Sequence, residues 1–170
     1  RNNEYPELTV FEPVQGEGNP GLNITPEFYS LLRKTVSEHD GLMLADSVQA
    51  GWRCTGELSI TQYPGFEEIP PPDMETFSKA INAGQFPLSI LAVNDKVSRL
   101  FKSGIYGNTM STNPRALNVG LQVLKEMNPT VRANIRIKGW KFLNMLNRLT
   151  KQFDFLGNCR GTGLLLSLEL

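Results

Sequence analysis

The sequence lacks the features that mark several classes of protein. Its 170 residues include only two cysteines, Cys54 and Cys159, which excludes a disulfide scaffold and a zinc site. Seventeen basic and seventeen acidic residues give a formal net charge of zero, whereas an electrostatic nucleic-acid binder normally shows a basic excess. The longest apolar runs, at 42–45 and 164–166, fall far short of the about 20 residues that span a membrane. We therefore predict no metal site, no nucleic-acid partner and no membrane partner.

The sequence does contain enough apolar side chains to bury a core. Hydrophobic residues make up 40% of it, which argues against intrinsic disorder and suits one ordinary domain or a piece of a larger one. The chain begins at Arg1 rather than at a Met, and it ends at Leu170 inside the apolar run 164–170. We therefore expect a fragment whose last strand is cut off.

Short apolar segments alternate with helical patterns along the chain. Thr25 is a candidate N-cap before Pro26, and apolar residues then recur at helical spacing. Strands that alternate with helices predict an α/β sheet with right-handed crossovers, in which a wholly apolar strand is buried on both faces. The predicted strands are 8–11, 42–45, 74–77, 88–93 and a last one after a turn at 161–163; the predicted helices are 26–39, 114–127 and 131–152.

Polar residues that follow the predicted strands are candidates for function, because open α/β sheets bind ligands beyond the carboxyl ends of their strands. Glu12, Asp46 and Lys79 hold such positions. A carboxylate at Asp46 would be partly desolvated and would need a cationic partner or several donors. The alternative is an acid that caps a nearby loop or helix. Small and apolar residues around Lys79 would lower the proton affinity of its amine and make it a nucleophile, and the alternative is an exposed surface lysine.

A third candidate site precedes the predicted helix at 114–127. Gly107–Thr109 and Ser111–Asn113 offer hydroxyls and backbone amides beside a helix N-terminus, an arrangement that can bind an anion. Asn113 can instead act as the N-cap of that helix, and the two roles are compatible.

Five stretches, in this order, resemble motifs of the class III, pyridoxal-phosphate-dependent aminotransferases. This family contains the ornithine, acetylornithine, 4-aminobutyrate and lysine ω-aminotransferases. The resemblance covers essentially the whole chain. The five are Phe11–Gly18, similar to E-P-x-Q-G-E-G; Leu44–Gly51 with Thr55-Gly56, similar to D-E-V-Q-x-G…T-G; Phe77–Ala80 through Gly84–Pro87, similar to S/A-K-G…G-G-F-P; Tyr106–Thr109 to Asn113-Pro114, similar to H-G-S-T-x-x-x-N-P; and Cys159–Leu164, similar to x-R-G-x-G-L.

The resemblance implies part of a fold-type I, aspartate aminotransferase-like α/β fold. Residues 1–128 would be the latter part of the large domain that binds pyridoxal phosphate. Residues 129–170 would be a linking helix and the start of the C-terminal small domain. An upstream phosphate-binding loop and a ring that stacks on the cofactor would precede Arg1, and a substrate-facing arginine would follow Leu170.

The resemblance also implies roles for four residues at the cofactor. Lys79 would form a Schiff base with the aldehyde of pyridoxal phosphate and carry a proton between the substrate carbon and the cofactor. Asp46 would pair with the pyridinium nitrogen and keep it protonated. Gln49 would bind near the phenolic oxygen, and Val48 would pack on a face of the ring.

Two further roles concern the partners. Thr109 would reach the phosphate held by a neighbouring subunit, so the resemblance implies a homodimer with a shared active site. Glu17 would be a substrate residue that pairs with the C-terminal arginine. The implied reaction moves an amino group from an amine or amino acid to a 2-oxo acid. The alternatives are an aminomutase, racemase or decarboxylase of the same fold, or an inactive truncated product.

The chain departs from the family motifs around these positions. Ser47 stands where the family has an acid after the cofactor aspartate, and Arg53-Cys54 stands where it has Gly-Arg. The glycines after the cofactor lysine are reduced to Ala80–Ala83. Tyr106 and Asn108 replace the histidine and serine of the phosphate segment. These changes leave the substrate subgroup open.

Overall fold

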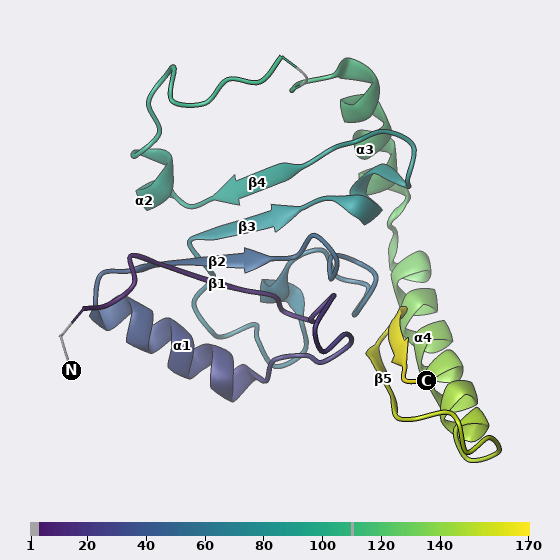
Figure 1. The fold of residues 1–170 in the computed structure, drawn as a ribbon. Helices are drawn as coiled ribbons and strands as arrows, with labels where there is room; N and C mark the ends of the chain where they lie inside the picture. The colour runs from purple at the N-terminus through teal and green to yellow at the C-terminus, as the bar shows by residue number, and fades with distance from the viewer. Residues whose placement is uncertain (1–3, 110) are drawn as a thin grey trace.

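The computed structural model describes residues 4–109 and 111–170, and it contains one four-stranded sheet and one hairpin (Figure 1). The sheet has the order β1-β2-β3-β4. Its strands are β1 (Leu8–Phe11), β2 (Leu42–Asp46), β3 (Met74–Phe77) and β4 (Ile90–Val93), and the hairpin consists of β5 (Cys159–Thr162) and β6 (Leu165–Leu168). The helices are α1 (Pro26–Glu38), α2 (Asp95–Ser98), α3 (Pro114–Glu126) and α4 (Pro129–Leu149), with 3₁₀ helices η1 (Ile60–Gln62) and η2 (Lys79–Asn82). Sequence reasoning had predicted the three long helices, but not α2, η1 or η2.

The sheet is parallel in its first three strands only. β1 pairs with β2 and β2 with β3 in parallel, whereas β4 runs antiparallel to β3, with Ile90 opposite Phe77. The prediction of a sheet built by crossovers alone is therefore wrong for β4. A parallel return needs a crossover connection, usually a helix, and the segment 78–89 contains only the short η2.

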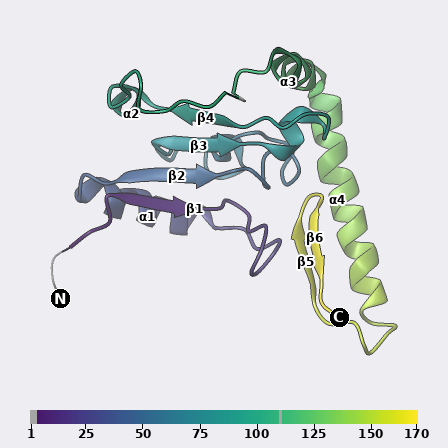
Figure 2. The same cartoon turned by 45° about the horizontal axis from the view of Figure 1, so that its top comes forward.

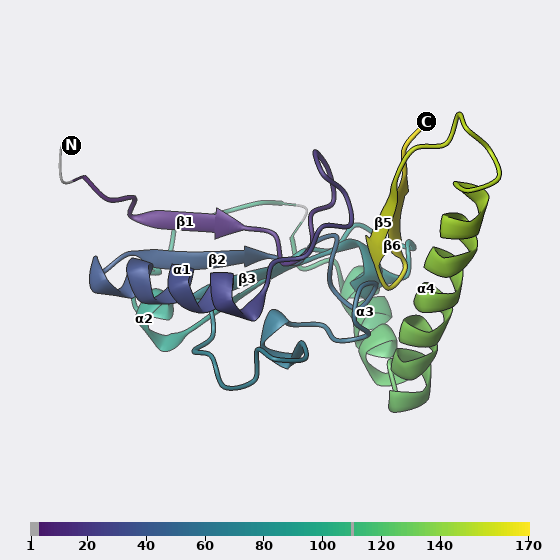
Figure 3. The same ribbon diagram turned by 90° about the horizontal axis from the view of Figure 1, so that it is seen from below.

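Helix α1 begins and ends where its sequence predicts. The Thr25 side chain accepts a hydrogen bond from the Phe28 N–H at 3.2 Å, and Pro26 occupies the first turn. The Gly41 N–H donates to the Val36 carbonyl at 3.0 Å, just beyond the C-terminus. The helix lies along the sheet (Figure 3) and buries Tyr29 and Val36 in the main core.

Only one face of the sheet is covered by the described chain. Met43 and Ala45 of β2 are fully buried in the core with α1. The other residues of β2, which are Leu42, Leu44 and Asp46, are half-exposed. The prediction that β2 is buried on both faces is therefore wrong. The strand registers place four apolar side chains, all at least 42% exposed, on that second face: Leu8, Val10, Leu91 and Val93.

The C-terminal segment stands at the carboxyl ends of the parallel strands (Figure 2). Asn128 caps α4, and its side chain accepts a hydrogen bond from the Val131 N–H at 3.1 Å. After α4 the chain forms the β5–β6 hairpin rather than the single predicted strand, with Gly163 in the turn at φ 59°. A Cβ on Gly139 of α4 would lie 2.4 Å from Gly163, so the helix and the hairpin approach backbone to backbone.

Ion pairs and hydrogen bonds join this C-terminal segment to the rest of the chain. Glu57 forms ion pairs with Arg132 and with Arg136 of α4, the second at 3.5 Å. Arg160 of β5 binds the Asn19 side chain in the loop after β1. The helix and the hairpin are therefore held beside the strand ends. Within residues 4–109 and 111–170, no helix is both long and apolar enough to cross a membrane.

Asp73, directly before β3, joins three segments at the opposite end of the sheet. Its Oδ2 accepts hydrogen bonds from Arg33 Nη1 at 2.7 Å and the Met43 N–H at 2.8 Å, and its Oδ1 accepts one from Asn94 Nδ2 at 2.8 Å. Burial opposes ionisation of Asp73, but these donors and the Arg33 charge outweigh it and lower the pKa of the carboxyl.

We expect Asp73→Asn to destabilise the fold by about 3 kcal/mol, because it leaves the half-buried Arg33 charge without its partner. The matched control is Asp40→Asn, which removes an ion pair of an exposed carboxyl with Lys96 and is expected to change stability little. Urea unfolding of the three proteins measures the difference, and equal losses in both variants would contradict this account.

The same network predicts a pH dependence. The pKa of Asp73 is lower in the folded chain than in the unfolded chain, so its contribution is complete above the unfolded value of about 3.9. That contribution disappears as the pH falls through the folded pKa. Wild type should therefore lose more stability than Asp73→Asn between about pH 5 and pH 2.

Candidate active site

The carboxyl ends of three parallel strands meet at one edge of the sheet, as the sequence predicts. Glu12 follows β1, Asp46 ends β2, and Ser78 and Lys79 follow β3. β4 begins at the same edge because it runs in the opposite direction. This edge therefore gathers three of the five motif segments, which are Phe11–Gly18, Leu44–Gly51 and Phe77–Pro87.

Asp46 is half-buried at the last position of β2. Its Oδ1 accepts hydrogen bonds from the Val48 N–H at 3.0 Å and from Thr76 Oγ1 at 3.2 Å. The Asp46 carboxylate thus caps its own turn, the role that the sequence offered as the alternative. Both of these hydrogen bonds use the same oxygen, Oδ1. Asp46 also lines a hollow of about 450 Å³ together with Glu12 and Gln15. An acid fixed through one oxygen at the wall of a hollow is suited to hold a cationic ligand group.

Gln49 brings the loop after β2 against the loop after β1. A Cβ on Gly16 would lie 2.2 Å from Gln49 Nε2, so a side chain at position 16 would displace the Gln49 amide. Glu12 Oε2 accepts a hydrogen bond from the Gly16 N–H at 2.7 Å and holds the same loop. Gln49 Oε1 accepts one from Arg53 Nη2 at 3.3 Å. Two of the motif loops are therefore in direct contact.

Lys79 begins η2 in a left-handed backbone conformation, with φ 43°. The residue is exposed, whereas Ile81 and Asn82 of the same short helix are buried. The structure therefore shows the alternative that the sequence left open, an exposed lysine, because the small neighbours of Lys79 do not enclose it. A non-glycine residue at positive φ costs energy and is found disproportionately at functional sites. Ser78 fixes the segment by donating from Oγ to the Leu88 carbonyl at 2.6 Å.

Asp46 and Lys79 stand at the same edge on adjacent strands. Asp46 is the register partner of Thr76, and Lys79 is the third residue after Thr76. Neighbouring strands lie about 4.8 Å apart, so the two residues flank one short stretch of the edge.

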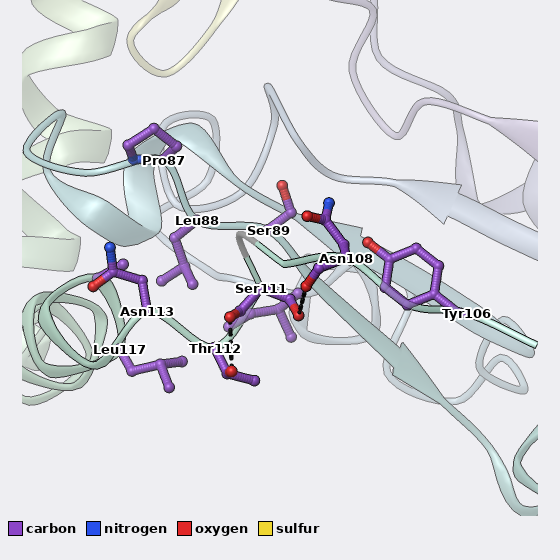
Figure 4. A pocket seen from close by; sticks show the side chains of 11 residues that line it. Pro87, Leu88, Ser89, Tyr106, Asn108, Ser111, Thr112, Asn113 and Leu117 are labelled. Atoms are coloured by element: carbon purple, nitrogen blue, oxygen red, sulfur yellow. Dashed lines mark hydrogen bonds between the residues drawn. The ribbon is translucent and has the colours of Figure 1, made fainter. Parts of the chain in front are cut away.

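Thr109 lies on a different part of this region. It is exposed in the segment that leads to α3. Its neighbours Asn108 and Ser111 line a separate hollow of about 420 Å³ with the start of β4 (Figure 4). Asn113 caps α3 and accepts a hydrogen bond from the Arg115 N–H at 3.0 Å, which confirms the capping role.

Glu17, the remaining predicted site residue, is exposed in the loop after β1. That loop contacts β5 through the Thr162 hydroxyl, which donates to the Gly21 carbonyl at 3.3 Å. The structure thus brings Asp46, Val48 and Gln49 together, sets Lys79 at the same edge, and leaves Thr109 and Glu17 at its exposed margins. Between residues 4 and 170, Met110 apart, no cluster of His, Cys, Asp and Glu could hold a metal ion.

Sequence reasoning missed Glu75, a buried acid beside this site. It is 5% exposed in β3 and accepts hydrogen bonds from Ser47 Oγ at 2.5 Å and Ser59 Oγ at 2.6 Å. Burial raises the pKa of the Glu75 carboxyl, and these donors counteract part of that effect. The available signal was an acid inside the predicted strand 74–77, at the same alternation as the apolar Phe77.

Comparison with known proteins identifies the family. The family model described as "Aminotransferase class-III" matches residues 9–170. The acetylornithine aminotransferase of Clostridium acetobutylicum is 32% identical over 163 residues, covering 95% of this chain and 41% of that protein. The chain thus spans about two-fifths of the length of this curated relative.

Solved structures agree in fold. The ornithine δ-aminotransferase of Plasmodium falciparum has a TM-score of 0.79 and 30% identity, over 94% of this chain and 40% of that one. The Toxoplasma gondii ornithine aminotransferase has a TM-score of 0.78 and 28% identity, over 95% of this chain and 37% of that one. That structure was crystallised in the presence of oxidised glutathione and shows partial occupancy of pyridoxal phosphate at its active site. The chain has the fold of these enzymes and belongs to the class III family of pyridoxal-phosphate-dependent aminotransferases.

Proposed function

We propose that the protein carrying this chain is a transaminase that moves an amino group from an amine or amino acid to a 2-oxo acid. In this proposal Asp46, Val48, Gln49 and Lys79 hold pyridoxal phosphate. The observation that carries it is the placement of Asp46 and Lys79 after adjacent parallel strands at one edge. The names of the relatives favour an amino donor of the ornithine or acetylornithine type.

The chemistry of these side chains fits the cofactor. Asp46 keeps one oxygen bound by the Val48 N–H and Thr76, and its other oxygen would face the cationic ring nitrogen. When bound, pyridoxal phosphate supplies an electron sink for the charge that develops as the substrate loses its proton. Asp46 would stabilise the positive ring, and Lys79 Nζ would hold the aldehyde end of the cofactor. Once the substrate amine has taken the place of Lys79 there, the freed Lys79 amine would take the proton from the substrate carbon.

The remaining roles concern the assembly and the substrate. We propose that Thr109 binds the cofactor phosphate across a homodimer interface and that Glu17 contributes to substrate choice. Exposed apolar residues between α2 and Thr109 support an interface there, since a patch of this kind marks a contact surface. They are Leu100, Phe101, Ile105 and Tyr106, each at least 59% exposed.

We also propose that the chain divides at residue 128 into the latter part of a cofactor domain and the start of a small domain. The break between α3 and α4 at Met127 and Asn128 supports this division. Because the chain spans 41% of its first curated relative, we propose that it is inactive when isolated.

Borohydride reduction in the presence of pyridoxal phosphate should attach the cofactor to Lys79, because its amine is exposed at the site edge. Peptide mass spectrometry locates the label. Lys79→Arg should abolish labelling and transamination. The control Lys96→Arg, which keeps a cation beside Asp40, should leave both unchanged. Label on another lysine of the wild-type protein would refute the assignment.

Asp46→Asn should slow amino transfer to 2-oxoglutarate by roughly 100-fold, since losing one partner of a partly buried charge pair costs about 3 kcal/mol. The amide keeps an oxygen for the Val48 N–H and Thr76 hydroxyl, so thermal stability should change little. Single-turnover kinetics measure the rate. An unchanged rate in this variant would show that Asp46 does not hold the ring nitrogen.

A further inference from the structure

Glu75 is a buried acid that no role described above uses. It lies in β3 opposite Ala45 of β2, and its side chain points into the covered face of the sheet. Its carboxylate accepts three hydrogen bonds: from Ser47 Oγ at 2.5 Å, from Ser59 Oγ at 2.6 Å and from the Ile60 N–H at 3.1 Å. These donors come from the turn after β2 and from the start of η1, so one carboxylate joins three segments.

Position 47, beside Glu75, is also one of the places where this chain departs from the motif that it resembles. The family motif resembled by 44–51 has an acid directly after the cofactor aspartate, where this chain has Ser47. Ser47 is 1% exposed and contacts Glu75 directly. In this chain a buried carboxylate therefore lies directly beside position 47, and the neighbouring strand β3 supplies it.

Ser47 connects Glu75 to the turn that carries the cofactor residues. Its N–H donates to the Thr76 carbonyl at 3.0 Å, and its carbonyl accepts from the Gly51 N–H at 2.8 Å. Ser47 stands between Asp46 and Val48, whose N–H holds the Asp46 carboxylate. On the other face of the sheet, the Thr76 hydroxyl holds the same carboxylate. A shift of the Ser47 side chain would thus move both the Asp46 carboxylate and the Val48 N–H that donates to it.

We propose that Glu75 is a positioning residue that replaces, from β3, the acid of the motif at position 47 and holds the Asp46 turn through Ser47. The proposal rests on the proposed function, because it concerns the turn assigned to pyridoxal phosphate. An ionised carboxylate at position 47 and an ionised Glu75 could not both be buried side by side, because their like charges would repel each other. Ser47 and Glu75 therefore form a matched pair, and each residue requires the other.

The first test compares two serines that donate to the same carboxylate. Ser47→Ala removes the donor on the Asp46 turn, and the matched control Ser59→Ala removes the donor at η1. Titration of the cofactor-free protein with pyridoxal phosphate should show about tenfold weaker binding in Ser47→Ala, because one lost hydrogen bond is worth about that much and Ser47 stands on the Asp46 turn. Binding should weaken by less than about twofold in Ser59→Ala, because Ser59 stands at η1 and not on that turn. Thermal unfolding should shift similarly in both. Equal losses of binding in the two variants would overturn the proposal.

The second test exchanges the two residues. Glu75→Ser leaves Ser47 without its acceptor, and Ser47→Glu places a second carboxylate beside Glu75, so each single variant should bind pyridoxal phosphate at least about tenfold more weakly. The double variant Ser47→Glu/Glu75→Ser restores one carboxylate and should bind within about threefold of wild type, because coupled sites are strongly non-additive. Double-variant binding no better than that of the weaker single variant would overturn the pairing.

These tests separate the two proposals. If the wild-type protein binds no pyridoxal phosphate, the proposed function fails, and the positioning role fails with it. If wild type binds the cofactor on Lys79 but Ser47→Ala matches Ser59→Ala and the exchange restores nothing, only the role of Glu75 is refuted. A single variant that does not fold leaves the serine comparison and the double variant to decide.

Discussion

The register between β2 and β3 is the constraint on which the rest of the structure depends. It sets Ala45 opposite Glu75 and Asp46 opposite Thr76, and so fixes what lies on each face of the sheet at its carboxyl edge. On the covered face, Glu75 receives donors from the turn after β2 and from η1. On the other face, Thr76 binds Asp46. A slip by one residue would exchange these faces and separate Glu75 from its three donors.

Two buried carboxylates at β3 stabilise this register by different means. Asp73 precedes the strand and pairs with the Arg33 guanidinium, so its pKa is lowered and its charge anchors α1 to the sheet. Glu75 receives only neutral donors in its hydrogen bonds, so burial prevails and its pKa is raised. Asp73 stabilises the fold at the amino end of the strand, while Glu75 contacts the turn at its carboxyl end, which we propose binds the cofactor.

The sequence predicts the parts of this fold that depend on local signals. Thr25 before Pro26, and Asn113 before Pro114, mark helix starts that the structure confirms, because a cap and a fixed φ act within a few residues. The direction of β4 and the β5–β6 hairpin were missed, since an apolar run does not indicate the direction of its partner. The sequence left open whether Lys79 is enclosed or exposed, because small neighbours in sequence do not enclose a side chain unless other segments cover it. The role of Glu75 required the register, which pattern reasoning does not supply.

The central claim is that Asp46 and Lys79 contact the two ends of one cofactor ring at this edge of the sheet. The most direct measurement is a crystal structure of the protein carrying this chain with pyridoxal phosphate bound. The account predicts the ring nitrogen within hydrogen-bond distance of the Asp46 carboxylate and the aldehyde carbon at Lys79 Nζ. A ring bound elsewhere, or one that contacts only one of these two side chains, would contradict the account.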